Sequence, residues 1–501
     1  MPTISSQILF FFWINFIVFV SWLFFIILAL NFIVSLVVEL AHFAISLLPK
    51  HKNPRVELVG EPFVSIMIPC YNEPSEILKN TLLSISKMDY QNFEVLVIDN
   101  NTKDEEIWKP VEEYCKILGQ NFRFFHVDQI VGFKAGALNF INKKVNPATQ
   151  FEVVLDADYE VRKDFLKIAL RYFVDDSISF VQFPQSYENV NKKNLPISLE
   201  YKYFFLSYMN MANNLNCVST TGTVTVYRAD TIKKAGNYNE KCITEDAEIG
   251  LKLNINGHKG IYVNRNIARG LMPYDLEAYK KQKIRWSQGN AQVLRVYFKN
   301  LFFDSSEVGI KQKIGFITQL TAWINFLLIP ILSLIMLSLI ELFGFQLASQ
   351  SIFHFIFTIS SLTIVTYVVL QAASYLVIFN KHSKMRDGLL AFWVHIGMTW
   401  VYATAWFKAV FSRRVYFERT NKFILTKEPS ILKNTFWELI LGTFSTYVFI
   451  DKLITGQYLT SVVYLLISFM LLSVFYVNLK ITPTKGFSEK LLDKFELEEM
   501  S

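Results

Sequence analysis

Two carboxylates, Asp156 and Asp158, stand one residue apart directly after the apolar run 151–155. Such a pair suits a hard divalent cation, Mg²⁺ or Mn²⁺, that is shared with a diphosphate. Asp158 is the predicted metal ligand, and Asp156 is predicted to orient a bound nucleotide. The alternative is an ordinary acidic turn in which one aspartate caps a helix.

A third carboxylate, Asp246, stands in the segment Thr244-Glu245-Asp246, where a helical pattern begins. It can serve as a general base that takes the proton from a hydroxyl as the oxygen attacks an anomeric carbon. Direct displacement with inversion needs only one such base. A carboxylate or threonine at this position can equally be a helix cap.

A polar and aromatic group follows in 279–297, which is predicted to form an amphipathic helix along a membrane. Gln282 and Arg285 can hold a leaving diphosphate, since the guanidinium presents a fork of donors, and Trp286 can stack on a sugar ring. In the other interpretation Trp286 anchors the helix in the interface and Arg285 contacts lipid phosphate. The spacing leaves both open.

The elements that must position these residues alternate between about 56 and 300. Strands are predicted over 63–69, 93–99, 122–127 and 151–156, and helices over 76–88, 107–118 and 134–145. This succession indicates a mostly parallel sheet of the nucleotide-binding kind, whose ligands lie at the carboxyl ends of the strands. Those ends carry Tyr71, Glu73, Asp99, Asn101, Asp156 and Asp158. Tyr71 and Glu73 could also form a plain turn before Pro74.

Apolar residues make up 52% of the 501 residues, which is rich for a soluble protein. The stretch 8–48 is predicted to form two spanning helices, 7–25 and 28–48, and lacks the basic start and cleavage site of a signal peptide. Four further spans are predicted over 317–342, 352–380, 434–450 and 459–479. The chain is therefore predicted to cross a membrane about six times.

Lysine and arginine collect after Leu48, after Asn380 and at 480–485, whereas the loop 341–351 has none. The positive-inside bias places that loop outside and the large middle region in the cytosol of a cell-membrane protein. The segment 389–411 is predicted to lie as an amphipathic helix in the cytoplasmic interface.

The net charge of +7 fits basic flanks beside anionic membrane lipid, so binding of nucleic acid is not expected. The four cysteines show no CxxC pairing and are expected to be reduced thiols rather than metal ligands or disulfides. A transporter or receptor with a regulatory nucleotide domain is an alternative class. The sequence disfavours it, because intramembrane charges are few and a Walker Gly-Lys-Ser/Thr loop is absent.

Taken together, Asp99, 156–158, 244–246 and 282–286 resemble the D, DxD, TED, QxxRW signature of processive, membrane-integrated family 2 glycosyltransferases, the cellulose, hyaluronan and chitin synthase group. Further similar elements are Gly132-Phe133-Lys134-Ala135-Gly136-Ala137-Leu138-Asn139, Val181-Gln182-Phe183-Pro184-Gln185, and Thr221-Gly222-Thr223 with Arg228. Asn100 and Asn101 stand where many members have a second Asp, which is closer to bacterial β-glucan synthases.

The resemblance implies a GT-A-type α/β domain that binds a nucleotide sugar and uses Mg²⁺ or Mn²⁺. It implies donor-binding roles for Tyr71, Glu73, Asp99, Asn101, Lys134, Asp156, Gln282 and Arg285, and acceptor-binding roles for Gln185, Gly222, Thr223 and Trp286. Asp158 would hold the metal, and Asp246 and Glu245 would be the catalytic residues, with Asp246 as the base. Lys134 could instead be a solvated residue at a helix start.

The expected activity is inverting transfer of a hexose, glucose from UDP-glucose first, to a β-glucan acceptor that is moved across the membrane. A non-processive glycolipid transferase, and donors such as GDP-mannose or UDP-N-acetylglucosamine, remain alternatives. The sequence does not indicate an oligomeric state.

The expected organisation is N-terminal membrane helices in 1–50, the transferase domain in 51–310, a membrane region in 311–480 and a cytosolic tail in 481–501. A loop over 413–428 resembles the gating loop of cellulose synthase through Phe417, Thr420 and Lys422, although Arg419 replaces its valine.

Overall fold

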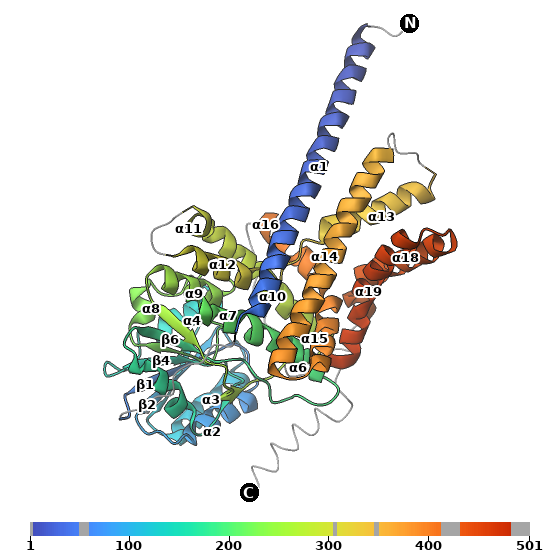
Figure 1. Cartoon of the computed structure of the whole chain (residues 1–501). Helices are drawn as coiled ribbons and strands as arrows, with labels where there is room; N and C mark the ends of the chain where they lie inside the picture. Colours follow the sequence, from blue (N-terminus) through green and yellow to red (C-terminus); the bar gives the residue numbers. More distant parts are fainter. Residues whose placement is uncertain (1–3, 50–59, 304–307, 345–349, 412–430, 482–501) are drawn as a thin grey trace.

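The computed structural model describes residues 4–49, 60–303, 308–344, 350–411 and 431–481 (Figure 1). It has an α/β part, formed mainly by residues 64–269, and a helical part, formed by the N-terminal helix and residues 310–481. The long helices of the helical part project from one side of the α/β part (Figure 1). The gating-like loop 413–428 and the tail 482–501 lie outside the described residues.

Seven strands form one sheet in the order β3-β2-β1-β4-β7-β6-β8. Neighbouring strands are parallel except where β7 pairs with β4 and β6, so β7 alone runs against the others. The strands are β1 Val64–Cys70, β2 Phe93–Asn100, β3 Phe122–Val127, β4 Phe151–Val154, β6 Ile178–Gln182, β7 Thr225–Arg228 and β8 Lys259–Tyr262. Strands β5 Glu160–Val161 and β9 Ala268–Arg269 pair separately. The predicted mostly parallel sheet is confirmed.

Both faces of the sheet are covered, which explains why its strands are continuous apolar runs. Every residue of β1 and β2 is buried. Ile66 and Ile68 pack in a cluster with helices α2, α3 and α5, whereas Met67 packs on the opposite face with α4, α7 and α9. These helices are α2 Ser75–Ser86, α3 Glu105–Leu118, α4 Phe133–Ile141, α5 Phe165–Leu170, α7 Asn210–Asn214 and α9 Glu245–Ile255.

The direction in which strands are added to the sheet changes after β3: β2 and β3 lie on one side of β1, and β4 lies on the other. A ligand crevice is expected at the carboxyl ends of the strands at this point, between β1 and β4.

Two long helical stretches connect the α/β part to the helical part. The first comprises α6 Leu195–Phe204, a π-helical turn Phe205–Met209 and α7, and the second is α10 Leu276–Val296. α10 packs against α16 and α12 of the helical part and against α9 of the α/β part. Shorter elements are η1 Arg171–Val174, α8 Thr231–Lys234 and α11 Phe298–Phe302.

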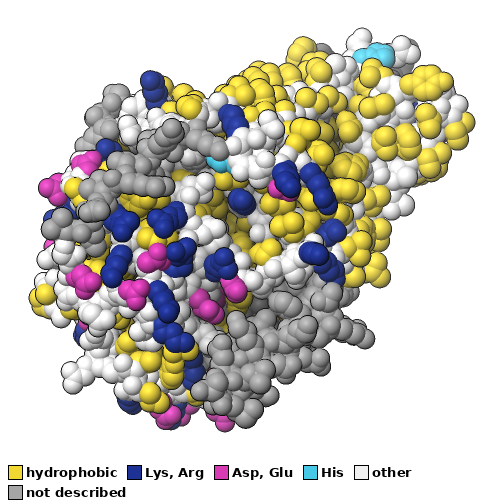
Figure 2. Space-filling model, turned by 60° about the horizontal axis from the view of Figure 1, so that its bottom comes forward, with side chains coloured by type: hydrophobic (Ala, Val, Ile, Leu, Met, Phe, Trp, Pro, Cys, Tyr) yellow, Lys and Arg dark blue, Asp and Glu magenta, His cyan; other side chains and the backbone are white. Residues whose placement is uncertain are grey.

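The helical part presents an apolar surface. Figure 2 shows hydrophobic side chains over the projecting helices, while charged side chains gather over the α/β part. Its helices are α1 Ile4–Leu47, α12 Ile310–Leu320, α13 Leu328–Leu342, α14 Gln350–His382, α15 Met385–Gly397, α16 Thr399–Phe411, α17 Ile431–Asn434, α18 Phe436–Ile454 and α19 Tyr458–Ile481.

Among the described residues, three segments are long and apolar enough to cross a membrane: Phe19–Leu47, Gln350–His382 and Tyr458–Ile481. The bent pair of α15 and α16 would be a fourth if it counts as one span. This is fewer than the six predicted, because α13 has only 15 residues and α18 carries charged residues near both ends. The three segments indicate a membrane protein.

Two predicted spans take a different form in the structure. The predicted pair 7–25 and 28–48 is the single helix α1, because 25–31 contains no glycine or proline that would end a helix. The predicted span 317–342 is divided into α12 and α13. At the break, the Asn325 amide donates to the Thr399 carbonyl at 3.1 Å and accepts from the Leu327 backbone N–H at 3.2 Å.

The segment 389–411 belongs to two helices, α15 and α16, which meet at a bend of 50°. Gly397 at this bend lies close to α19, since a Cβ there would stand 2.8 Å from the Ser473 carbonyl oxygen. α15 packs against α14, α19 and α6, whereas α16 packs chiefly against α10. An interfacial position for this segment stays a prediction.

Candidate active site

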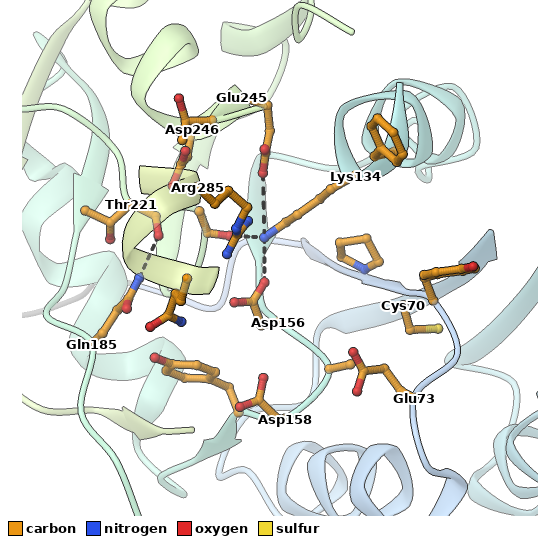
Figure 3. Close-up of a pocket in the computed structure, with 18 of the residues that line it drawn as sticks. Cys70, Glu73, Lys134, Asp156, Asp158, Gln185, Thr221, Glu245, Asp246 and Arg285 are labelled. Carbon is orange, nitrogen blue, oxygen red and sulfur yellow. Dashed lines mark hydrogen bonds and ion pairs between the residues drawn. The ribbon is translucent and has the colours of Figure 1, made fainter. Parts of the chain in front are cut away.

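A cavity of about 340 Å³ lies at the carboxyl ends of β1, β2 and β4 (Figure 3). The predicted site residues in its lining come from three of the four motifs (156–158, 244–246 and 282–286) and from other segments: Tyr71, Glu73, Asn101, Lys134, Asp156, Asp158, Gln185, Gly222, Glu245, Asp246, Gln282, Arg285 and Trp286. The structure therefore brings together residues that are separated by more than two hundred positions in the sequence.

Asp99 and Thr223 are not in the lining of this cavity. The buried Asp99 carboxylate accepts from Thr102 Oγ1 at 2.7 Å and lies 3.0 Å from His126 Nδ1. Thr223 Oγ1 accepts from the Asp156 backbone N–H at 3.0 Å. Both side chains support the wall from behind, and direct contact with a ligand stays a prediction for them. Phe417, Thr420 and Lys422 lie outside the described residues.

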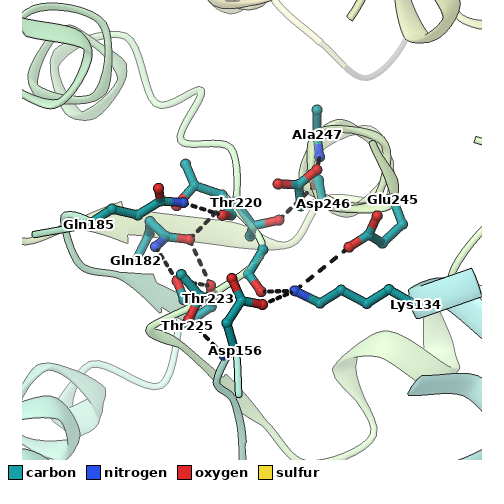
Figure 4. A network of polar contacts seen from close by, with 12 residues as sticks. Lys134, Asp156, Gln182, Gln185, Thr220, Thr223, Thr225, Glu245, Asp246 and Ala247 are labelled. Atoms are coloured by element: carbon teal, nitrogen blue, oxygen red, sulfur yellow. Dashed lines mark hydrogen bonds and ion pairs between the residues drawn. The ribbon is translucent and has the colours of Figure 1, made fainter. Parts of the chain in front are cut away.

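Lys134 stands in the first turn of α4, whose N-cap is Gly132 in a left-handed conformation with φ 88°. Its ammonium nitrogen lies 2.5 Å from Asp156 Oδ1 and 2.6 Å from the Gly222 carbonyl oxygen. Glu245 Oε1 is 3.9 Å away (Figures 3 and 4). Burial lowers the pKa of Lys134, but the carboxylates of Asp156 and Glu245 outweigh it and raise the pKa overall, so the side chain stays charged. Lys134 is therefore a cation inside the cavity, not a solvated surface residue.

The pair Asp156 and Asp158 follows β4 in a turn that leads to β5. No helix starts there, so the alternative of a helix cap is wrong. Asp158 Oδ2 accepts from the Leu271 backbone N–H at 2.8 Å, which fixes the carboxylate at the cavity wall. No group of three or more His, Cys, Asp or Glu that could hold a metal occurs in the described part of the chain. The pair still fits Mg²⁺ or Mn²⁺, because such ions are commonly held by one or two carboxylates together with substrate phosphates.

Asp246 lies in the first turn of α9, and both its backbone carbonyl and its carboxylate are held by hydrogen bonds. Its carbonyl oxygen accepts from Thr220 Oγ1 at 2.7 Å, and its Oδ1 accepts from the Ala247 backbone N–H at 2.9 Å. Thr244 occupies the N-cap position but makes no side-chain cap bond. Burial raises the pKa of both Glu245 and Asp246, and the Asp246 charge raises the pKa of Glu245 further. A carboxylate with a raised pKa in a cavity is suited to general-base work.

The raised pKa of Asp246, the predicted general base, leads to an expected pH profile for the enzyme. A base must be ionised, and its ionised fraction is lost as the pH falls through the pKa. The acidic limb of kcat/KM should therefore fall at a higher pH than an ordinary aspartate would give. The profile of the wild type tests this, and the residual rate of Asp246→Asn should lack the inflection. An inflection at the ordinary aspartate pKa would contradict it.

Gly222 lies beside the Asp246 carboxylate. A Cβ at Gly222 would stand 2.9 Å from Asp246 Oδ2, and φ is +79°. Gly222→Ala should lower kcat by up to about 100-fold, because it displaces the carboxylate that is predicted to be the base. Gly236→Ala is the matched control, since Gly236 has φ +88° but open space around its Cβ. Equal loss of activity in both variants would show that backbone strain alone is responsible.

A buried amide, Gln182, holds the loop that carries Gly222 and was not among the predicted site residues. Its Nε2 donates to the Thr223 carbonyl at 2.9 Å, and its Oε1 accepts from the Thr221 backbone N–H at 2.9 Å (Figure 4). Gln185 adds a bond from Nε2 to the Thr221 carbonyl at 2.8 Å. A polar residue at the end of an apolar strand was the sequence signal for Gln182. Tyr187 and Tyr159 also line the cavity, without such a signal.

α10 carries Gln282, Arg285 and Trp286 at positions i, i+3 and i+4, which share one helix face. Asp275 begins the helix by accepting from the Ala278 backbone N–H at 2.8 Å. All three residues line the cavity, so Arg285 and Trp286 are not confined to the surface of the molecule. Tyr201 donates a hydrogen bond to Gln282 Oε1.

A second, smaller cavity of about 60 Å³ adjoins the first, and Asp246 and Trp286 contribute to both. Its lining is rich in aromatic residues: Tyr201, Phe204, Phe205, Trp286 and Trp323. The ring of Trp323 lies 4.8 Å from that of Trp286 and stacks on Phe204 at 4.5 Å. Trp323 lies between α12 and α13, so this cavity extends from the site toward the helical part.

The sheet, the crevice at its strand ends and the cavity lined by carboxylates define an α/β domain with a candidate ligand site at its strand ends. Residues 62–289 match the family model described as Glycosyltransferase like family 2. The α/β part is therefore a family 2 glycosyltransferase domain, and the expected fold, a GT-A-type domain with flanking apolar helices, is confirmed.

Curated relatives match stretches of similar length. The chain is 28% identical over 243 residues to the cellulose synthase catalytic subunit (UDP-forming) of Pseudomonas fluorescens strain SBW25, which covers 47% of this chain and 32% of the relative. It is 27% identical over 254 residues to the probable glucomannan 4-β-mannosyltransferase 1 of Arabidopsis thaliana, which covers 48% of this chain and 45% of the relative. The chain thus spans less than half of the length of either protein.

Among solved structures, a mannosyltransferase of Pyrobaculum calidifontis in complex with GDP-Man and Mn²⁺ overlaps 69% of this chain and 97% of its own. Its TM-score is 0.49 at 16% sequence identity, an overlap too loose to bear on the chemistry of the site.

Proposed function

We propose that the protein transfers a hexose from a nucleoside diphosphate sugar to a growing β-glucan and passes the product across the membrane. UDP-glucose is the first choice of donor. The observation that carries this proposal is the single cavity in which the Asp156 and Asp158 pair, the Asp246 carboxylate and the Arg285 face of α10 meet. The α/β part is proposed to face the cytosol, as the distribution of basic residues indicates.

The donor would lie along the carboxyl ends of β1, β2 and β4. Tyr71, Glu73 and Asn101 line the end of the cavity nearest β1 and β2, where a uridine and ribose would bind. Asp158, with the diphosphate, would hold Mg²⁺ or Mn²⁺, which neutralises the charge of the diphosphate. The charged Lys134 would lie beside the same phosphates, because it already pairs with Asp156.

The transfer step needs one base and a stabilised leaving group. The acceptor hydroxyl oxygen attacks the anomeric carbon, Asp246 takes its proton, and the bond from that carbon to the diphosphate oxygen breaks. Arg285 stabilises the charge that develops on the departing diphosphate. One displacement of this kind inverts the anomeric centre, so an α-linked donor gives a β-linked product.

The acceptor would lie on the other side of Asp246, against Gln185, Gly222 and Trp286. The adjoining aromatic cavity supports this direction, since its rings lead from Asp246 to Trp323 at the edge of the helical part. A product that leaves through this cavity enters the helical part, which has the candidate membrane spans.

Mannose is the second candidate sugar, because one curated relative is named as a probable glucomannan 4-β-mannosyltransferase.

The deciding experiment incubates the purified full-length protein with UDP-glucose, UDP-N-acetylglucosamine or GDP-mannose, each with Mg²⁺ or Mn²⁺. Linkage and length analysis of the product should show a β-glucan polymer from UDP-glucose only, and chelation of the metal should abolish it. If the protein instead makes a mannan from GDP-mannose, mannose replaces glucose as the transferred sugar. If it consumes none of the donors, the proposal is refuted.

A further inference from the structure

A buried ion pair lies beneath the active-site face of α10. Lys283, within the QKIRW motif, donates to Glu200 of α6 at 2.9 and 2.6 Å. The two side chains are only 1% and 2% exposed. Tyr279 of α10 and Tyr402 of α16 also donate to Glu200, at 2.8 and 3.2 Å. One carboxylate therefore joins α6, α10 and α16.

The Lys283 ammonium also lies among aromatic rings that line the two cavities. It is 4.4 Å from the Tyr201 ring centre, 4.9 Å from that of Trp286 and 5.6 Å from that of Trp323. Tyr201 follows Glu200 in α6 and bonds to Gln282, the neighbour of Lys283. The ion pair thus sits directly behind Gln282 and Trp286, which face the site.

α10 is attached to the helical part at two further points. Lys280 pairs with Glu438 of α18 and donates to the Asn434 carbonyl of α17 at 2.7 Å. Arg295 donates to the Ala409 carbonyl of α16 at 3.3 Å. In contrast, Asp156 and Asp158 follow a strand at the centre of the sheet. The two sides of the cavity are therefore held by different parts of the molecule.

A buried ion pair is a costly way to gain stability, since well-packed apolar residues often stabilise a core as much or more. Such a pair does supply a fixed geometry. If either partner moved away, the charge of the other would be left buried and uncompensated. Bonds from Tyr279 and Tyr402 occupy Glu200 further and fix its orientation.

We propose that Lys283 and Glu200 are positioning residues for the acceptor side of the active site. They hold Trp286 of α10 in place beside the aromatic cavity, and Tyr402 ties this part of α10 to α16 of the helical part. This inference rests on the proposed sugar transfer. Its main consequence is that changing these residues should slow transfer to the acceptor without changing the binding or hydrolysis of the donor.

The first test uses Tyr402→Phe, which removes one hydroxyl from Glu200 and keeps the ring. Transfer from UDP-glucose to the acceptor should fall about tenfold, as expected for loss of a hydrogen bond to a charged group. The affinity for UDP and the slow hydrolysis of UDP-glucose without acceptor should stay within about twofold of the wild type, the scatter allowed for an unperturbed site. Tyr367→Phe is the matched control: Tyr367 is an equally buried tyrosine of α14, but its hydroxyl bonds to His395.

The second test removes both charges at once in Glu200→Gln with Lys283→Met, which avoids leaving one charge buried alone. The ratio of donor hydrolysis to sugar transfer should rise, as in Tyr402→Phe. Amide hydrogen exchange of 276–296 should become faster in both variants and not in Tyr367→Phe, and this measurement requires no catalytic activity.

The outcomes separate this inference from the proposed function. If the wild type transfers no sugar from any donor, the proposed function fails, while the exchange rates of α10 still test the ion pair. Unchanged transfer and unchanged exchange in the folded variants would overturn the inference. Equal losses of transfer, hydrolysis and UDP affinity would also overturn it, because they indicate general loosening of the domain.

Discussion

Replacing Asp246 by asparagine should lower kcat for sugar transfer by about 1,000-fold, the range expected when a general base is removed. Asparagine keeps the size of the side chain and an oxygen that can accept from the Ala247 backbone N–H. It cannot take a proton from the acceptor hydroxyl. Transfer is measured with UDP-glucose and acceptor, and binding of UDP is measured separately and should be retained.

The neighbouring Glu245 provides the control for this experiment. Its carboxylate is 3.9 Å from the Lys134 ammonium, on the donor side of the cavity. Glu245→Gln should therefore change the KM for the donor more than kcat. If Glu245→Gln abolishes transfer and Asp246→Asn retains it, the base has been assigned to the wrong carboxylate.

Arg285→Ala should produce the second large effect, a fall in kcat of about 100- to 1,000-fold, since it removes the group that we propose to stabilise charge on the leaving diphosphate. Arg285 lines the cavity, and its charge lowers the pKa of both Glu245 and Asp246. Arg285→Lys should recover part of the rate, because lysine keeps the charge but lacks the fork of donors. Steady-state kinetics of the two variants tests this.

Lys281→Ala is the matched control, because it also removes one positive charge from α10. Lys281 lies on the same helix, is 42% exposed and pairs with Glu277 at 3.1 Å. It should leave kcat within about twofold of the wild type, as surface substitutions usually do. Equal losses in Arg285→Ala and Lys281→Ala would mean that the net charge of α10, and not the guanidinium in the cavity, determines the rate.

Much of the α/β part could be predicted from local sequence. β1, β2 and β4 are apolar runs that end in polar residues, and parallel strands bring their carboxyl ends to one edge of the sheet. That rule is enough to place Tyr71, Asn101 and Asp158 in one region of the molecule. The breaks of the membrane helices were less predictable, because Asn325 ends a helical pattern only through its bond to Thr399 in a distant helix.

The direction of individual side chains was also beyond local rules. Asp99 follows the same strand-end rule as Asp156, yet its carboxylate is occupied by Thr102 and His126 and lies outside the cavity lining. Lys134 could have been a solvated residue at a helix start. Only the approach of Asp156 and the Gly222 carbonyl, which come from other elements, makes it a cation of the site.

The class of the domain, the mostly parallel sheet and the identity of most residues that line the cavity follow from the amino-acid sequence, because they depend on periodicity and on residues next to strand and helix ends. Three features required the folded chain: which of those side chains face the cavity, the aromatic cavity that adjoins Asp246, and the ion pair of Lys283 and Glu200 that joins α10 to α6 and α16. These features arise from contacts between residues far apart in the chain, and spacing along the sequence carries no record of which distant side chains will meet.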